Sequence, residues 1–359
     1  MLQNRFGRLA AAALAGSMLL GAAACGGSEE PTTSAKPEGS ASGAAPAAKG
    51  PKVGLAYDIG GRGDQSFNDA AAAGLDKAKT ELGLAETKEL EAGNGETEAA
   101  KEERLRLLAQ GGYNPVIAIG FAYSGSVKKV AAEFPDVKFA IVDDAAATGP
   151  NISSLLFAEH EGSFLVGAAA ALKSKKDHVG FVGGVQVPLI QKFEAGFVAG
   201  AKKVKPGIKV DVKYLTQPPD FAGFNDPAKG KTAAQGMFDA GADVVYHAAG
   251  GSGGGVFEAA KAAKGLAIGV DSDQAKTAAA DVQSVIMTSM IKKVDVAVFD
   301  FLKSFTTNSV KAGTTVYDLK AGGVDYSTTG GQVDDIKAKL DEYKQQIISG
   351  AITVPDKNS

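Results

Sequence analysis

One loop near the start of the chain combines an aromatic ring with an amide and several carboxylates. The segment from Tyr57 to Asn68, YDIGGRGDQSFN, lies between an apolar run and an alanine-rich one. Ser66 is a candidate N-cap, which would put Phe67 at the mouth of a helix rather than on its buried stripe. A planar heterocycle that stacks on Phe67 gains about 1–3 kcal/mol, while Asn68 or Asp58 can hydrogen-bond to its edge. The alternative is that Phe67 packs under the helix as a hydrophobic staple.

Patterns that would indicate catalysis are weak. Ser252 satisfies GxSxG within a glycine run, but that elbow expects its histidine later in the chain, and His160, His178 and His247 all precede it. Those histidines also lack metal-ligand spacing. The segment Lys229–Thr232 lacks the upstream glycine of a phosphate-binding loop. We therefore expect no enzyme, no metal site and no cofactor.

The elements that must position these residues alternate along the chain from Val53 onward. Strands are predicted at Val53–Tyr57, Val116–Ile119, Phe139–Val142, Val179–Val182, Lys209–Leu215, Val244–His247, Ala267–Val270, Val285–Thr288 and Thr315–Leu319. Helices are predicted at Phe67–Leu82, Glu96–Gln110, Val127–Phe134, Gly162–Lys173, Ile190–Val204, Thr232–Ala240, Val256–Lys264, Ile291–Phe305 and Val333–Ile348. This alternation predicts an α/β protein whose parallel sheets are covered on both faces.

Most of the predicted strands end in glycine- or aspartate-rich loops. Ligands of open α/β sheets bind outside the carboxyl ends of the strands, so these loops indicate a cleft. Two sheets facing each other suit the chain length better than one large sheet. We expect a first lobe of residues 52–151 plus 291–313 and a second of residues 152–290 plus 314–350. Ile152–Phe157 would cross between them.

The first 51 residues resemble an export leader and a tether. Arg5 and Arg8 precede an apolar run that ends at Cys25, the only cysteine, and this order is typical of a signal peptide over residues 1–24. Cys25 and the Gly-Gly-Ser after it resemble a bacterial lipobox, in which the thiol receives a diacylglycerol. The alternative is an ordinary secretory signal with an unrelated cysteine. Residues 25–51 are rich in Gly, Ser, Pro and Ala, which predicts a flexible linker. The protein would thus be lipid-anchored on the extracytoplasmic face of the cell membrane.

Several further segments, in order and at regular spacing, join the first loop in a resemblance to a known family. They are FAIVDD from Phe139, EGSFLVG from Glu161, VGFVGG from Val179, FEAGFVAG from Phe193, GADVVYHAAGG from Gly241, IGVDSDQ from Ile268 and TSMIKK from Thr288. Over residues 52–298 the chain resembles the basic membrane protein (BMP) lipoproteins, the purine nucleoside receptor type of solute-binding protein. That family is similar in fold to type I periplasmic binding proteins, with two doubly wound lobes, three crossovers and a ligand enclosed at a hinged cleft.

The resemblance implies which residues hold a purine. Two aromatic rings sandwich it in the family, and they are matched by Phe67 and Phe193; Phe197, one turn later, is more consistent with the core. Polar positions around the ligand are matched by Asp58, Asn68 and Asp143. Asp144 could take the place of Asp143, and the sequence does not distinguish the two, although we favour Asp143.

Residue chemistry adds candidates for the sugar. Asp271 ends a predicted strand, and an ionised carboxylate accepts two hydrogen bonds at once, as the adjacent hydroxyls of a ribose require. Gly250 and Gly251 would let a ligand approach the backbone closely. Lys292 or Lys293 would either donate to a ribose oxygen or pair with Asp271.

The resulting hypothesis is a monomeric receptor that delivers a nucleoside, most simply a purine nucleoside, to the permease and ATPase subunits of an ABC importer. The alternatives are a surface sensor of the same fold and a receptor for another small molecule such as a sugar. The net charge of −3, with neither sign concentrated, argues against a nucleic-acid partner.

Overall fold

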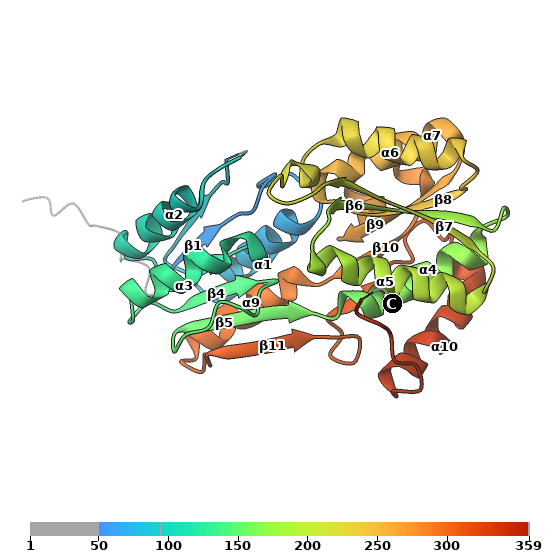
Figure 1. The fold of residues 1–359 in the computed structure, drawn as a ribbon. Helices are drawn as coiled ribbons and strands as arrows, with labels where there is room; N and C mark the ends of the chain where they lie inside the picture. Colours follow the sequence, from blue (N-terminus) through green and yellow to red (C-terminus); the bar gives the residue numbers. More distant parts are fainter. Residues whose placement is uncertain (1–49, 94, 358–359) are drawn as a thin grey trace, which may run out of the picture. The chain divides into compact units, whose positions relative to one another are not determined.

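The computed structural model describes residues 50–93 and 95–357, so the predicted leader, Cys25 and nearly all of the linker lie outside the described residues. The described chain contains two six-stranded sheets, in the orders β11-β5-β4-β3-β1-β2 and β12-β10-β9-β8-β6-β7. Figure 1 shows them as two α/β lobes side by side. The two-lobe α/β prediction is confirmed. Within these residues, no helix combines the length and the apolarity that crossing a bilayer requires.

The first sheet is parallel throughout, and helices cover both of its faces. Its strands are β1 (Lys52–Ala56), β2 (Glu86–Leu90), β3 (Val116–Ala118), β4 (Phe139–Val142), β5 (Ile152–Phe157) and β11 (Gly313–Tyr317). Its helices are α1 (Phe67–Glu81), α2 (Glu98–Gln110), α3 (Ser124–Glu133) and α9 (Val294–Thr306), with the short η1 (Phe121–Tyr123) before α3. Alternate strand residues face opposite layers: Ile117 packs with the α1 and α9 side, whereas Val116 packs with α2 and α3.

The second sheet is parallel except for its last strand, β12, which runs antiparallel to β10. Its strands are β6 (His178–Val185), β7 (Lys209–Thr216), β8 (Val244–Ala248), β9 (Leu266–Asp271), β10 (Ile286–Lys292) and β12 (Val324–Tyr326). Its helices are α4 (Glu159–Lys173), α5 (Pro188–Val204), α6 (Pro227–Asp239), α7 (Gly253–Ala263), α8 (Gln274–Thr277) and α10 (Lys337–Ile348). Short 3₁₀ turns are η2 (Ala222–Phe224), η3 (Gly250–Ser252), η4 (Gln283–Val285) and η5 (Asp334–Ile336).

The chain passes between the sheets three times: from β5 to α4, from β10 to α9, and from β11 to β12. All three crossings differ from the predicted lobe ranges, the one after β10 only because residues 291 and 292 still belong to the second sheet. Residues 152–157 form β5, which pairs with β4 and β11, and residues 313–317 form β11, so both segments belong to the first sheet. The physical reason is that a buried apolar strand and an extended connection have the same local sequence pattern, and only pairing tells them apart.

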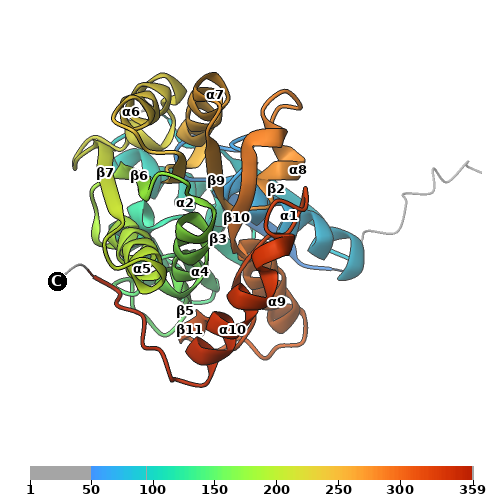
Figure 2. The same cartoon turned by 90° about the vertical axis from the view of Figure 1, so that its right-hand side faces the viewer.

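Helices α4 and α5 lie side by side (Figure 2), in contact through glycines. A Cβ atom on Gly196 would lie 2.1 Å from the carbonyl oxygen of His160, and one on Gly200 would lie 2.0 Å from that of Phe164. Only glycine permits such an approach of two backbones. This seam fixes Glu159, at the start of α4, relative to Phe193 on α5.

Candidate functional site

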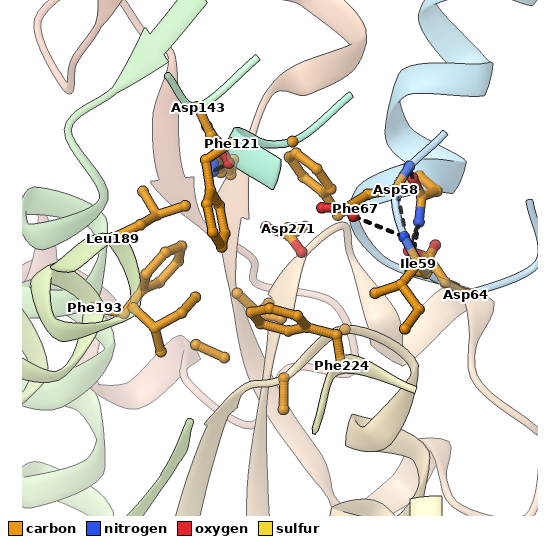
Figure 3. A pocket seen from close by; sticks show the side chains of 18 residues that line it. Asp58, Ile59, Asp64, Phe67, Phe121, Asp143, Leu189, Phe193, Phe224 and Asp271 are labelled. Carbon is orange, nitrogen blue, oxygen red and sulfur yellow. Dashed lines mark hydrogen bonds and ion pairs between the residues drawn. The ribbon is translucent and has the colours of Figure 1, made fainter. Parts of the chain in front are cut away.

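A cavity lies between the two lobes at the carboxyl ends of the strands (Figure 3). Its lining comprises Asp58, Ile59, Asp64, Phe67, Asn68, Gly120, Phe121, Asp143, Leu189, Ile190, Phe193, Phe224, Ala248, Ala249, Gly250, Val270, Asp271 and Lys292. Eight of the nine residues predicted to contact a ligand are therefore brought together. The exception is Gly251, which lies in a neighbouring groove, where a Cβ atom would be 3.3 Å from the Oδ1 atom of Asn225.

Aromatic rings enter the cavity from both lobes. Phe67, the first residue of α1, is half-buried, and Phe193 of α5 is buried on the opposite side (Figure 3). Phe197 is fully buried against Tyr246, with ring centroids 5.2 Å apart, which confirms that it belongs to the core. Sequence reasoning missed Phe121 and Phe224, which also line the cavity. The position of Phe121 directly after a strand-ending glycine was a usable signal, whereas Phe224 ends the short turn η2, whose sequence has no periodic pattern.

Lys292, the last residue of β10, occupies the centre of a buried charged cluster. Its ammonium donates a hydrogen bond to Asp143, and its Nζ atom lies 3.2 Å from Oε1 of Glu159. Lys292 is 2% exposed and Glu159 1%. The Nζ atom also lies 5.0 Å from the ring centroid of Phe67 and 5.5 Å from that of Phe193, within the range of cation–π attraction.

This cluster corrects one of the two roles considered for Lys292. The residue pairs with Asp143 and Glu159 rather than directly with Asp271. Burial opposes its charge, but the neighbouring carboxylates, that of Asp143 first, outweigh burial and hold the pKa of Lys292 above its ordinary value. One ammonium thus faces two buried carboxylates. Sequence reasoning missed Glu159, because nothing local indicates that it meets Lys292.

The structure shows which residue of each pair, Asp143 or Asp144 and Lys292 or Lys293, lines the cavity, a choice that the sequence left open. Asp143 lines the cavity with a left-handed φ of 67°, whereas Asp144 accepts hydrogen bonds from the Ser124 hydroxyl at 3.0 Å and the Ala147 amide at 2.7 Å. Lys292 lines the cavity, whereas Lys293 precedes α9 as its N-cap residue.

The loop before α1 is organised by Asp64, not by Ser66 as expected. Ser66 stands at the N-cap position, but its hydroxyl makes no capping bond. Instead, the Asp64 carboxylate accepts hydrogen bonds from the backbone N–H groups of Ser66, Asn68 and Asp69 at 2.9–3.1 Å. A carboxylate in this place satisfies the free N–H groups of the first helical turn and the positive end of the helix dipole. The Ser66 hydroxyl is thereby left to bind elsewhere.

Asp58 and Asn68 are joined to each other. The backbone N–H of Asp58 donates to Oδ1 of Asn68 at 3.1 Å. Both donor hydrogens of the Asn68 amide are also committed, to the Ile59 carbonyl at 3.3 Å and to Asp64 at 3.1 Å. Asn68 therefore holds the loop that presents Asp58 to the cavity.

Asp271, at the end of β9, is buried and has a left-handed φ of 65°. Its Oδ2 atom accepts a hydrogen bond of 2.5 Å from the Ser66 hydroxyl of the other lobe. Burial raises the pKa of Asp271, while Lys292 and this hydrogen bond act in the opposite direction. The carboxyl therefore contributes to both the cavity wall and the contact between lobes.

The pKa values of the other lining carboxyls are raised as well, mainly by burial. Burial raises the pKa of Asp58 to about 7, against the opposing effect of the Ile59 N–H and Lys101, and that of Asp64 to about 6. A carboxyl whose pKa is higher in the folded state than in the unfolded state contributes stability that is complete below the unfolded pKa. That contribution is lost as the pH rises through the folded pKa, which for Asp58 places the loss between about pH 4 and 7.

We expect Asp58→Asn to flatten this part of the pH dependence. The melting temperature of the ligand-free variant should exceed that of the wild type by a few degrees at pH 8 and match it near pH 4, because the amide carries no charge to bury. Calorimetric melting from pH 4 to 8 measures this, with the exposed Asp239→Asn as a control that keeps the wild-type slope. If the melting temperatures of Asp58→Asn and the wild type changed equally with pH, burial would not raise the pKa of Asp58.

Comparison with known proteins agrees with this geometry. The family model described as "ABC transporter substrate-binding protein PnrA-like" (Bmp) matches residues 51–358. The ABC transporter nucleoside-binding protein BmpA of Lactococcus lactis is 36% identical, over 85% of this chain and 89% of its own. An uncharacterized lipoprotein of Pyrococcus abyssi is 35% identical, over 78% and 69%. A solved ABC transporter solute-binding protein of Aeropyrum pernix superposes with a TM-score of 0.74 at 28% identity, over 86% of this chain and 94% of that one. The chain therefore belongs to the Bmp family of PnrA-like ABC transporter substrate-binding proteins, with the fold of type I periplasmic binding proteins.

Proposed function

We propose that this protein binds a purine nucleoside in the cavity between its lobes and delivers it to an ABC permease and its ATPase. The observation that carries the proposal is the placement of Phe67 and Phe193, one from each lobe, on opposite sides of a cavity whose lining combines apolar side chains with four carboxyls (Figure 3). The name of the Lactococcus relative, a nucleoside-binding protein, supports the same class of ligand.

Stacking would supply the contact that favours the closed state. A base between the two rings touches both lobes at once, and a ligand shifts a conformational equilibrium only through contacts that differ between the states. Each stack contributes about 1–3 kcal/mol. Together with charge-assisted hydrogen bonds, two stacks can account for the roughly −8 kcal/mol of a micromolar site.

We assign the polar residues of the cavity to different parts of the nucleoside. We assign Asp271 and Lys292 to the ribose, since the carboxylate accepts from adjacent hydroxyls and the ammonium donates to an oxygen. Asp58 and Asp143 would contact the base, and Gly250, with a left-handed φ of 54°, would admit the ligand close to the backbone. Asn68 has its donors committed within the loop, so we assign it the positioning of Asp58.

The charge of the residues that line the cavity favours a ligand without a phosphate group. Four carboxyls line the cavity, and the single lysine among the described lining residues already pairs with Asp143 and Glu159. A phosphate group would enter this environment without a free cation. The site therefore suits a nucleoside and disfavours the corresponding nucleotide.

We further propose that the protein acts as a monomer tethered by a lipid on Cys25. The lipobox-like sequence around Cys25 and the naming of the Pyrococcus relative as a lipoprotein support the anchor. Residues 26–51 would then act as the spacer between membrane and receptor.

Calorimetric titration tests the ligand class. Protein stripped of ligand by denaturation and refolding should bind inosine, guanosine or adenosine with a micromolar or lower Kd, and inosine monophosphate at least tenfold more weakly. Arabinose serves as the comparison for a sugar receptor. Absence of heat with all three nucleosides, from protein whose circular dichroism shows it to be refolded, would contradict the proposal.

A further inference from the structure

Three hydrogen bonds join the two lobes at one place, and one of them is made to Asp271 of the cavity wall. They link residues Gln65 and Ser66, before α1 in the first lobe, to Asp271 at the end of β9, to Ser272 after it and to Gln274 at the start of α8 in the second. The Ser66 hydroxyl donates to Asp271 at 2.5 Å, while the backbone carbonyl of Gln65 accepts from the Ser272 hydroxyl at 2.9 Å and from the Gln274 amide at 3.0 Å. We call these residues the inter-lobe latch.

Gln274 is held in place from within its own lobe. It is 2% exposed, and its Oε1 atom accepts the backbone N–H of Val270 at 2.8 Å and contacts Nε2 of His247 at 3.0 Å. Because a backbone N–H can only donate, it fixes the orientation of the Gln274 amide and aims the NH₂ group at the Gln65 carbonyl of the other lobe. A chain of hydrogen bonds thus runs from the second core to the first lobe.

His247 supports this orientation. The ring is fully buried edge-on to Phe257, with centroids 5.1 Å apart, and burial lowers its pKa to about 4. A neutral imidazole has one donor nitrogen, and the acceptor Oε1 requires it to be Nε2. A Cβ atom on Gly253 would lie 1.9 Å from the ring atom Cε1 of His247, so the glycine at the start of α7 leaves room for this ring.

The acceptor in the first lobe is equally well defined. Gln65 has a left-handed φ of 55°, and its N–H donates to the Asp69 carboxylate at 2.9 Å. The next N–H, of Ser66, is held by Asp64 at 2.9 Å. The Gln65 carbonyl is therefore fixed toward the second lobe, and its bond with the Gln274 amide forms between two groups that contacts within each lobe already orient.

We propose that Gln274 and Ser272 are positioning residues whose hydrogen bonds to the Gln65 carbonyl hold the lobes closed and so set how slowly a bound ligand leaves. This rests on the proposed function only in taking the ligand to be a nucleoside. The two bonds exist when the lobes meet and are exchanged for water when they part, so they favour the closed state for any ligand. A contribution to the closed state is expected to appear mainly in the dissociation rate.

Gln274→Glu is the sharpest test. The carboxylate keeps both acceptor bonds within its lobe but replaces the inter-lobe donor with an oxygen that faces the Gln65 carbonyl. Stopped-flow measurement with the nucleoside that binds the wild type should show dissociation about tenfold faster, with association changed less than twofold. The matched control is Gln283→Glu, whose amide donates to the Ala278 carbonyl at 2.8 Å within one lobe and whose substitution should leave both rates unchanged.

Ser272→Ala provides a second variant, which introduces no charge and, because this serine is only half-buried, should not disturb the fold. It should speed dissociation about threefold and, like Gln274→Glu, increase the radius of gyration of the ligand-free protein in X-ray scattering. If both variants fold and have the dissociation rate and the radius of gyration of the wild type, the proposal that the latch holds the lobes closed is wrong. If the wild type binds no nucleoside, the proposed function fails instead, and the scattering comparison alone then decides the latch.

Discussion

Lys292→Met should lower the free energy of unfolding by about 3–5 kcal/mol, because it leaves buried carboxylates without their cation. Asp143 and Glu159 both contact this ammonium, and both are buried. Methionine fills much of the same volume, so the loss reports charge rather than packing. Denaturant unfolding followed by circular dichroism measures it.

Two further variants make this prediction specific. Lys192→Met removes a one-third-exposed lysine 3.8 Å from Glu159 and should change the free energy of unfolding by less than about 1 kcal/mol. Adding Asp143→Asn to Lys292→Met should recover part of the lost stability, because one unpaired charge disappears. A Lys292→Met protein as stable as the wild type would show that the cluster is not held by this pairing.

Phe67→Ala should weaken nucleoside binding at least tenfold while the fold stays intact. The ring is half-buried at the first position of α1, so its removal costs little core packing but eliminates one stack worth about 1–3 kcal/mol. Calorimetry gives the Kd, and thermal melting gives the stability.

Phe299→Ala is the matched control for that loss. Phe299 is also half-buried in the first lobe, on α9, where it packs with the Lys77 ammonium 4.3 Å from its ring centroid. Its removal should leave nucleoside affinity unchanged. Unchanged affinity in Phe67→Ala as well would establish that the Phe67 ring is structural, as the staple alternative holds.

The sequence predicted best those parts of the fold that are buried on both faces. Strands such as β4 and β8 are buried along their whole length and mainly apolar, and their bounds were predicted to within one residue. The strand β2, with the sequence ETKEL, was missed because it is an edge strand whose charged side chains carry no apolar pattern. A helix predicted from Ile291 begins at Val294, because residues 291 and 292 complete β10.

The site was predictable where it depends on strand ends and not where it depends on long-range pairing. Asp58, Asp143 and Asp271 follow or end parallel strands, and such residues gather at one edge of a sheet. Glu159 reaches Lys292 only because β5 and β10 end at adjacent crossings, which no local pattern encodes. The latch bond between Ser66 and Asp271 likewise depends on how the lobes meet.

The central claim is that the Phe67 and Phe193 rings hold a nucleoside between the lobes. It is tested most directly by mass spectrometry of the small molecules that denaturation releases from the purified full-length protein. We expect about one equivalent of a purine nucleoside from the wild type and at least tenfold less from Phe67→Ala and Phe193→Ala purified in the same way. Release of a sugar or another compound in place of a nucleoside, or equal nucleoside release from all three proteins, would contradict it.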